Sequence, residues 1–193
     1  MAVRPATQLR HDYVAPGIGR LDSSRASSMK NPVMRPATLA DAEAIARIYN
    51  YYIQNSVITF EEEPLSVQDM AARLTETRGL SLPWLVAETD GAVVGYAYAR
   101  KWRPRSAYRF SVETTIYLER GHEGRGIGKM LYSQLLPILR ERGMHVAIGG
   151  VALPNEASIA LHEKLGFQLV ATFRQVGFKH DRWVDVAYWQ LVL

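Results

Sequence analysis

Three alternating glycines carry the clearest chemical signal in the sequence. Gly124, Gly126 and Gly128 lie directly before a segment with apolar residues at helical spacing, which predicts a glycine-rich loop that opens a helix. A helix start has free backbone N–H groups at the positive end of its dipole, and glycines let an anion approach them closely. The residues that add positive charge there are Arg120, Arg125 and Lys129. The loop is therefore predicted to bind a pyrophosphate.

Other common sites are excluded by individual positions and by composition. A Walker A loop requires glycine at Glu123 and serine or threonine at Met130, and the dinucleotide fingerprint requires glycine at Leu131. The chain has no cysteine, which excludes disulfides, thiolate metal sites and a cysteine nucleophile. The five histidines do not have the spacing of a helical metal pair, so no metal is expected.

The overall composition is typical of one soluble domain. The chain has 193 residues, of which 48% are hydrophobic and 22% charged. No apolar run approaches the roughly 20 residues of a membrane-spanning helix, so no membrane partner is expected. The net charge of +4 is small, which indicates mild attraction for an anionic ligand and not a nucleic-acid surface. The lack of cysteine fits a reducing, cytoplasmic location.

The sequence divides near residue 30. Residues 1–30 show no hydrophobic period and contain proline, glycine and a serine cluster, which is typical of a disordered extension. The regular pattern that follows predicts a single domain over residues 31–193.

Hydrophobic periodicity predicts the elements that must position the glycine loop. Asp90 and Gly91 indicate a two-residue hairpin, and Pro137 is expected to kink the helix that follows the loop. The order of two helices, three strands, helix, strand, helix and two strands predicts an α/β fold, a mixed sheet with helices on both faces. Helices are expected over 38–53, 66–79, 127–143 and 154–165, and strands over 84–89, 92–100, 108–118, 146–151, 167–178 and 183–193.

The glycine loop and several other segments resemble one family. A strand, then (Q/R)xxGx(G/A), then a helix is similar to the acetyl-CoA signature of the Gcn5-related N-acetyltransferase superfamily, with Glu123 in place of the usual glutamine or arginine. Further segments resemble the phosphinothricin N-acetyltransferase subfamily: VETTIY at 112–117, LPN at 153–155, LHEKLG at 161–166, GFKH at 177–180, the tryptophan-rich end at 183–191, and Trp102 with Tyr108. The resemblance covers residues 34–192.

The resemblance implies the fold, the cofactor and the oligomer. The fold would be that of the Gcn5-related acetyltransferases, with a mixed, mostly antiparallel sheet, and the protein would be a homodimer that uses acetyl-CoA as co-substrate. Backbone amides of 116–118 would hold the thioester end, and 124–129 the diphosphate. Glu123 is expected to tune affinity only. The residues assigned to acetyl-CoA are Ile116, Tyr117, Leu118, Gly124, Arg125, Gly126, Ile127, Gly128, Lys129 and Asn155.

The resemblance also assigns catalytic roles. Acetylation requires a neutral amine, so a base must remove a proton from the ammonium. The resemblance places the catalytic glutamate at Glu113, whereas alternation alone favours a solvated strand residue. His162 stands where many members of the superfamily have a tyrosine that protonates the CoA thiolate. His162 could supply that proton or act as a second base, and a structural histidine is the alternative. Tyr132 could be an acid, a substrate contact or a core residue.

Arginines before the Glu113 strand suit an acidic substrate. The guanidinium groups of Arg103 and Arg105 can bind a carboxylate or phosphinate in a bidentate fork. In the resemblance, these arginines and Tyr108 hold the substrate, and Phe60 closes over it. The full set of residues assigned to the substrate is Phe60, Arg103, Arg105, Tyr108, Thr115, Tyr117 and Tyr132. Tryptophans assigned to core or dimer packing are Trp102, Trp183 and Trp189.

The sequence thus predicts direct acetyl transfer to the α-amine of a small L-amino-acid analogue such as phosphinothricin. One alternative is a broader amino-acid acetyltransferase for methionine sulfoximine or sulfone. Another is a non-catalytic acyl-CoA-binding sensor, against which Glu113 and His162 argue. A nucleic-acid-binding module would rest on the pI alone.

Overall fold

The computed structural model describes residues 31–193, and the predicted disordered extension over 1–30 lies outside them. Within the described part, no helix is long and apolar enough to cross a membrane. The elements in chain order are β1 (Val33–Pro36), α1 (Ala42–Asn55), α2 (Val67–Gly79), β2 (Trp84–Thr89), β3 (Ala92–Lys101), β4 (Ser111–Leu118), α3 (Ile127–Glu141), β5 (Val146–Ala152), α4 (Glu156–Lys164), β6 (Gln168–Lys179) and β7 (Arg182–Val192), with short 3-10 turns at Leu39–Asp41 and Ser106–Tyr108.

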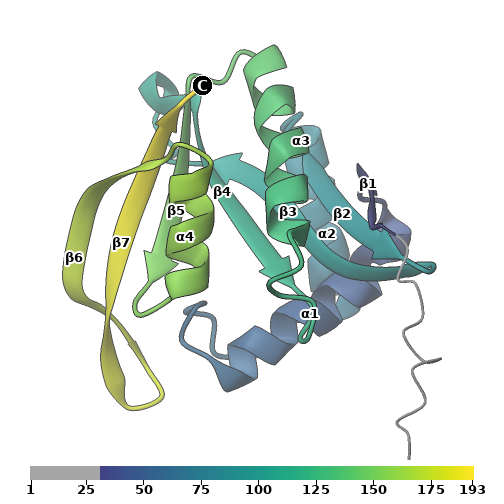
Figure 1. Ribbon diagram of the computed structural model, residues 1–193, viewed down its shortest axis with the longest axis horizontal. Coiled ribbons are helices and arrows are strands. Elements are labelled where there is room, and N and C mark those ends of the chain that lie inside the picture. The colour runs from purple at the N-terminus through teal and green to yellow at the C-terminus, as the bar shows by residue number, and fades with distance from the viewer. Residues whose placement is uncertain (1–30) are drawn as a thin grey trace, which may run out of the picture.

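The strands form one seven-stranded sheet in the order β1-β2-β3-β4-β5-β7-β6 (Figure 1). Among the strands of residues 31–193, only β4 and β5 pair in parallel, and every other neighbouring pair is antiparallel. The expected mixed, mostly antiparallel sheet is therefore confirmed. Strand β1 was not predicted, because four residues ending in Pro36 are too few to show a hydrophobic period.

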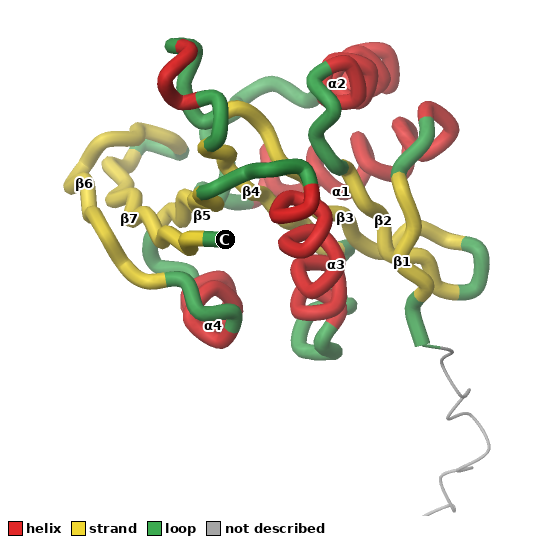
Figure 2. Tube along the Cα trace, turned by 90° about the horizontal axis from the view of Figure 1, so that it is seen from above, coloured by secondary structure: helices red, strands yellow, loops and turns green. Residues whose placement is uncertain are grey.

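Helices cover both faces of the sheet, as expected (Figure 2). Alternation along β2 divides the core, since Leu85 and Ala87 pack with α3 on one face and Trp84 and Val86 pack with α1 and α2 on the other. The apolar rows that fit these faces are Ile45, Ile48, Tyr49 and Ile53 on α1 and Leu131, Leu135 and Leu139 on α3. The helical spacing in the sequence thus predicted which side of each helix is buried.

Two local predictions differ from the structure. The strand predicted over 108–118 begins only at Ser111, because Ser106–Tyr108 forms a 3-10 turn that leaves Tyr108 and Phe110 exposed. Helix α3 contains Pro137 and ends at Glu141, short of the predicted end at Gly143, and the expected kink at the proline stays a prediction. Burial of the apolar face of α3 against the sheet offsets the loss of one backbone hydrogen bond at the proline.

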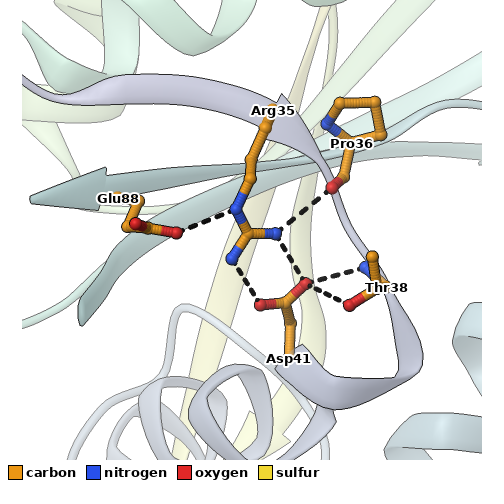
Figure 3. Close-up of polar contacts among 5 residues, drawn as sticks. All are labelled: Arg35, Pro36, Thr38, Asp41 and Glu88. Atoms are coloured by element: carbon orange, nitrogen blue, oxygen red, sulfur yellow. Dashed lines mark hydrogen bonds and ion pairs between the residues drawn. The ribbon is translucent and has the colours of Figure 1, made fainter. Parts of the chain in front are cut away.

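An ion pair joins the edge strand to the start of α1 (Figure 3). Arg35 on β1 donates from both terminal nitrogens to Asp41 at 2.8 Å each, and its Nε donates to Glu88 on β2 at 2.8 Å. Asp41 also accepts from the Thr38 backbone N–H and hydroxyl. The hydrogen bonds from Arg35 hold the pKa of Asp41 at about 2, against the opposing effect of burial. This contact fixes how the chain enters the first helix.

Strands β4 and β5 separate soon after they meet. Their pairing covers only Ser111 with Val146, Val112 with Ala147, and Glu113 with Ile148. Beyond Glu113, residues 114–118 pair with β3 on one side alone. Because the glycine loop and α3 follow directly after β4, this separation places free strand backbone beside the start of that helix.

Candidate active site

Glu113 lines a cavity on the α1 and α2 side of the sheet. The cavity has a volume of about 480 Å³, and its walls come from the segment after α1, from β3 and β4, and from β5 with the β6–β7 hairpin. Alternation along β4 brings Glu113, Thr115 and Tyr117 to this face. Phe60 also lines the cavity, on its outer side. Four residues predicted to belong to one site are thus brought together.

The carboxylate of Glu113 is held by an arginine that the sequence analysis missed. Arg100 on β3 is the cross-strand partner of Glu113. Its Nη2 and Nε lie 2.9 Å and 3.1 Å from Oε2 of Glu113. Residues directly opposite on an antiparallel pair approach closely enough to interact, so the register fixes this ion pair. Only the register of β3 against β4 reveals it, because Arg100 reads in the sequence as the last residue of a strand.

Tyrosine hydroxyls supply much of the polar lining. Tyr49, Tyr98 and Tyr188 all line the cavity, and burial raises the pKa of each, that of Tyr49 to about 12. Their hydroxyls therefore remain protonated at neutral pH and can donate hydrogen bonds. None of these three tyrosines was predicted as a site residue, because each lies in an ordinary apolar pattern of its helix or strand.

A second carboxylate in the lining is neutralised by its own partners. Glu61 accepts two hydrogen bonds from Arg73 on α2, at 2.7 Å and 2.9 Å, and one from the Tyr49 hydroxyl at 3.0 Å. Burial opposes ionisation, but these hydrogen bonds outweigh it and lower the pKa of Glu61. Both oxygens of Glu61 are thus bound to Arg73, whereas Arg100 contacts only Oε2 of Glu113, so Glu113 is the carboxylate better placed to take a proton.

His162 lies on the opposite face of the sheet from Glu113. Gly149 and Gly150 are neighbours on β5, so their side-chain positions point to opposite faces. A Cβ on Gly149 would lie 2.2 Å from Nε2 of His162, whereas a Cβ on Gly150 would lie 3.5 Å from Oε1 of Glu113. The two predicted catalytic groups are therefore separated by the β5 backbone.

The surroundings of His162 make it a neutral, packed side chain. It is 3% exposed, and its ring lies 5.0 Å from that of Phe167. Nδ1 lies 2.8 Å from the Ser158 carbonyl oxygen and must donate to it, so Nε2 is the acceptor nitrogen, 3.4 Å from the Tyr132 hydroxyl. Burial lowers the pKa of His162. Tyr132 is fully buried, and its single hydroxyl proton can go either to Nε2 of His162 or to Thr114 Oγ1, which lies 3.3 Å away.

The glycine loop has the backbone geometry of an anion site. Gly121, Gly124 and Gly126 all adopt the left-handed region, and Gly126 is the N-cap of α3. A Cβ on any of the three would meet no atom within 4 Å, so their surroundings are open. The first backbone hydrogen bond of α3 runs from Met130 N to Gly126 O. The N–H groups of residues 127–129 therefore have no partner within the helix. These features fit a diphosphate.

The residues predicted to contact acetyl-CoA differ in how exposed they are. Arg125 and Lys129 are exposed at the loop, while Ile127 and Gly128 are buried. A Cβ on Gly128 would lie 3.1 Å from Leu161 and 3.3 Å from Ile116, so this glycine lets α3 pack closely on α4 and β4. Asn155 caps α4 by accepting from Ser158 N at 3.1 Å.

The strand edge next to the loop also fits the cofactor. Ile116, Tyr117 and Leu118 lie in the part of β4 that has separated from β5, so the backbone on that side has no strand partner. The Leu118 carbonyl oxygen accepts from the Tyr52 hydroxyl at 2.6 Å. The other backbone groups on that side of the strand suit the amide-rich arm of acetyl-CoA, and those at the start of α3 suit its diphosphate. Among residues 31–193, no group of three or more histidine, aspartate or glutamate side chains could hold a metal ion.

Arg103, Arg105 and Tyr108 do not line the cavity. All three are exposed in the segment between β3 and β4. Arg103 lies over the Trp102 ring, 4.6 Å from its centroid, and Trp102 in turn packs edge-on against Tyr188 of the cavity wall at 5.5 Å. The arginines predicted to bind the substrate therefore lie outside the cavity, and their role stays a prediction.

Comparison with known proteins agrees with this geometry. Residues 34–188 match the family model described as an acetyltransferase (GNAT) domain. The chain is 41% identical to a phosphinothricin N-acetyltransferase of Streptomyces viridochromogenes over 85% of this chain and 90% of the relative. It is 36% identical to an L-methionine sulfoximine/L-methionine sulfone acetyltransferase of Salmonella typhimurium, over 83% and 94%. A phosphinothricin acetyltransferase of Sinorhizobium meliloti, solved with acetyl-CoA, superposes with a TM-score of 0.82 at 42% identity, over 85% and 89%.

The family match and the relatives show that this chain is an N-acetyltransferase that uses acetyl-CoA, and its fold agrees with them. The chain belongs to the GNAT acetyltransferase family and is similar within it to the phosphinothricin N-acetyltransferases.

Proposed function

We propose that this enzyme transfers an acetyl group from acetyl-CoA to the α-amine of a small L-amino-acid analogue such as phosphinothricin, within a ternary complex. The observation that carries the proposal is the place of Glu113. Its carboxylate lies in a cavity of about 480 Å³, on the last residue of β4 that still pairs with β5. A ligand of amino-acid size fits a cavity of this volume. The names of the relatives support a substrate of that kind.

Glu113 acts as the general base in this proposal. It accepts a proton from the substrate ammonium, directly or through one water, which frees the nitrogen lone pair to attack the thioester carbonyl. Acetyl-CoA supplies the activated acetyl group. Arg100 holds the Glu113 carboxylate in place, and the tyrosine hydroxyls of the cavity orient the substrate.

We assign protonation of the leaving CoA thiolate to residues on the other face of the sheet. Tyr132 and His162 lie there, with their hydroxyl and Nε2 3.4 Å apart. Because Nδ1 of His162 carries its proton and donates to Ser158, Nε2 has none to give. Tyr132 is therefore the donor of the pair, and His162 orients its hydroxyl. Glu113 remains the only base in the cavity lining that we assign.

A turnover panel tests the proposed function. CoA thiol release is measured with phosphinothricin, methionine sulfoximine, methionine sulfone and the common amino acids, each with and without enzyme. Phosphinothricin is expected to give the highest kcat/KM. A higher value for methionine sulfoximine or sulfone would favour the broader amino-acid acetyltransferase. Acetyl-CoA binding without thiol release for any amine would indicate a sensor and overturn the proposal.

We also propose that two copies pair through the β6–β7 hairpin. Strand β6 is a free edge of 12 residues at one end of the sheet (Figure 1). The hairpin leaves large apolar side chains more than half exposed, including Phe178 and Trp183, whose rings lie 5.0 Å apart. Such an apolar surface on a long strand edge is typical of an interface. Light scattering should give a dimer, and Trp183→Ser should shift it toward monomer.

Catalysis is assigned to residues 31–193, which hold Glu113, Arg100, Tyr132, His162 and the glycine loop. An enzyme that lacks residues 1–28 should keep the turnover and melting temperature of the full chain. A large loss of either would show that the first 30 residues contribute to the domain.

A further inference from the structure

A buried lysine connects two walls of the cavity. Lys179 is the last residue of β6 and is 2% exposed, and its Nζ donates to the main-chain oxygen of Thr59 at 2.9 Å. Thr59 belongs to residues 57–61, which follow α1, and residues 58–61 of this segment line the cavity. The two residues lie 120 positions apart in the sequence. The contact therefore ties the 57–61 segment to the β6–β7 hairpin.

The same segment rests on the hairpin through an aromatic ring. A Cβ on Gly177 would lie 2.3 Å from Cζ of Phe60, so the ring occupies the space that any larger residue at Gly177 would need. Val57 adds a small apolar contact with Ala152 and Val184. Three residues of the segment, Val57, Thr59 and Phe60, thus contact the wall that β5, β6 and β7 form.

The other side of the segment is fixed to the helices. The Thr59 hydroxyl lies 2.7 Å from that of Tyr49 on α1, and Glu61 forms its ion pair with Arg73 on α2. Lys179 is therefore the polar contact that holds the segment on the hairpin side, opposite the Tyr49 and Arg73 contacts. Without it, Thr59 and Glu61 would keep the segment on the helices, and Phe60 would lose its fixed distance from Gly177.

Stability alone does not account for an ammonium at this position. Removing a charged group from water is costly unless its partners compensate, and an apolar side chain of similar length would fill the same space without that cost. A charged donor reaching a main-chain oxygen does what an apolar side chain cannot, because it fixes one backbone position relative to another.

We propose that Lys179 is a positioning residue that holds the 57–61 segment against the hairpin and so sets how closely Phe60 confines the amine substrate. This inference rests on the proposed function, since it assigns the cavity to the amine. It concerns residues on the α1 and α2 face, away from the glycine loop on which acetyl-CoA is expected.

The test compares Lys179→Met with Lys164→Met. Methionine keeps the apolar stem of Lys179 and removes its donors, and Lys164 is an exposed lysine on α4 that serves as the matched control. For Lys179→Met, the KM for the amine should rise by about tenfold, the size expected for a lost charged hydrogen bond, while the Kd for acetyl-CoA stays unchanged. Amide hydrogen exchange in residues 57–61 should also become faster. Lys164→Met should match the wild type in all three measurements.

A second variant keeps the inference testable if Lys179→Met fails to fold. Gly177→Ala leaves Lys179 in place and displaces the Phe60 ring, so it should give the same rise in amine KM with unchanged acetyl-CoA affinity. An unchanged amine KM, or an equal loss of affinity for acetyl-CoA, would overturn the inference. Hydrogen exchange in residues 57–61 distinguishes a failure of this inference from a failure of the proposed function. If the wild type acetylates no amine, the proposed function fails, and unchanged exchange in Lys179→Met would independently show that Lys179 does not hold the segment.

Discussion

Glu113 and His162 lie on opposite faces of the sheet, with the backbone of β5 between them. Adjacent glycines on that strand make this arrangement possible, since Gly150 leaves room beside Glu113 and Gly149 leaves room for the His162 ring. The two groups therefore cannot share one proton-transfer step at the amine. The separation allows their contributions to be measured independently.

Glu113→Gln should abolish most of the catalysis while binding survives. Glutamine is nearly isosteric and can still accept from Arg100, but it cannot take up a proton, so kcat should fall by about 10²–10⁴-fold. The loss should be smaller at high pH, where more of the amine is already neutral. Near-normal turnover across the pH range would contradict the role of Glu113, although the acetyl-CoA assignment would stand.

His162 should make stability depend on pH near neutrality. Burial lowers the pKa of His162 below its usual 6.5, so the unfolded chain takes up this proton more readily than the folded one. The free energy of unfolding should therefore fall as the pH drops below about 6.5, and His162→Gln should show a shallower slope. Urea unfolding between pH 5 and 8 measures this. His145→Gln, at an exposed position, should keep the wild-type slope; a shallower slope there as well would show that the effect is not specific to His162.

Gly126→Val should weaken acetyl-CoA binding. Gly126 has a φ of +79°, which costs an L-residue roughly 1–2 kcal/mol, so valine should move the helix start and raise the Kd by about tenfold. No protein atom lies within 4 Å of the added Cβ, so the expected causes are the backbone geometry and crowding of the diphosphate. Gly143→Val is the matched control, because Gly143 has a φ of +74° at the far end of α3. It should lower the melting temperature without changing acetyl-CoA affinity. If calorimetry gives the same acetyl-CoA affinity for the two variants, the glycine loop is not part of the acetyl-CoA site.

The roles of Arg100 and Arg105 can be distinguished by replacing each of them with lysine. Arg100→Lys keeps a positive charge and loses the planar fork that contacts Glu113, so the KM for the amine should rise or kcat should fall. If Arg105 clamps the carboxylate of the substrate, Arg105→Lys should also raise the KM for the amine. Acetyl-CoA affinity should remain unchanged in both variants. Wild-type kinetics for Arg105→Lys would show that only the cavity-lining arginine acts on the substrate.

Asp41→Asn should destabilise the fold without affecting chemistry. The variant leaves Arg35 with a weaker partner in a half-buried place, which should cost about 1–3 kcal/mol of unfolding free energy. The pKa of Asp41 drops from 3.8 to about 2 on folding, so its contribution is complete above pH 4 and is lost between about pH 4 and pH 2. Asp41→Asn should lose less stability than the wild type over that interval. An equal loss of unfolding free energy in the wild type and in Asp41→Asn would show that other groups cause the loss of stability at low pH.

Local signals in the sequence determined most of the elements and the cofactor loop. Ser66 and Asp69 form the capping box of α2, and Asp90 with Gly91 forms the predicted turn between β2 and β3. Gly126 adopts the left-handed backbone at the start of α3. Each of these features depends on residues within a few positions of one another, so the chain around them is sufficient to predict them.

The tertiary structure decided which side chains meet in the cavity. Arg100 contacts Glu113 across 13 positions, and Lys179 contacts Thr59 across 120. The first contact depends on the register of two strands, and a shift by one residue would place the side chains on opposite faces. The second depends on the packing of a loop against a distant hairpin. The sequence alone therefore named Glu113 and His162 as candidates, but only the paired strands placed them on opposite faces of the sheet, because side-chain direction along a strand is fixed relative to its neighbours.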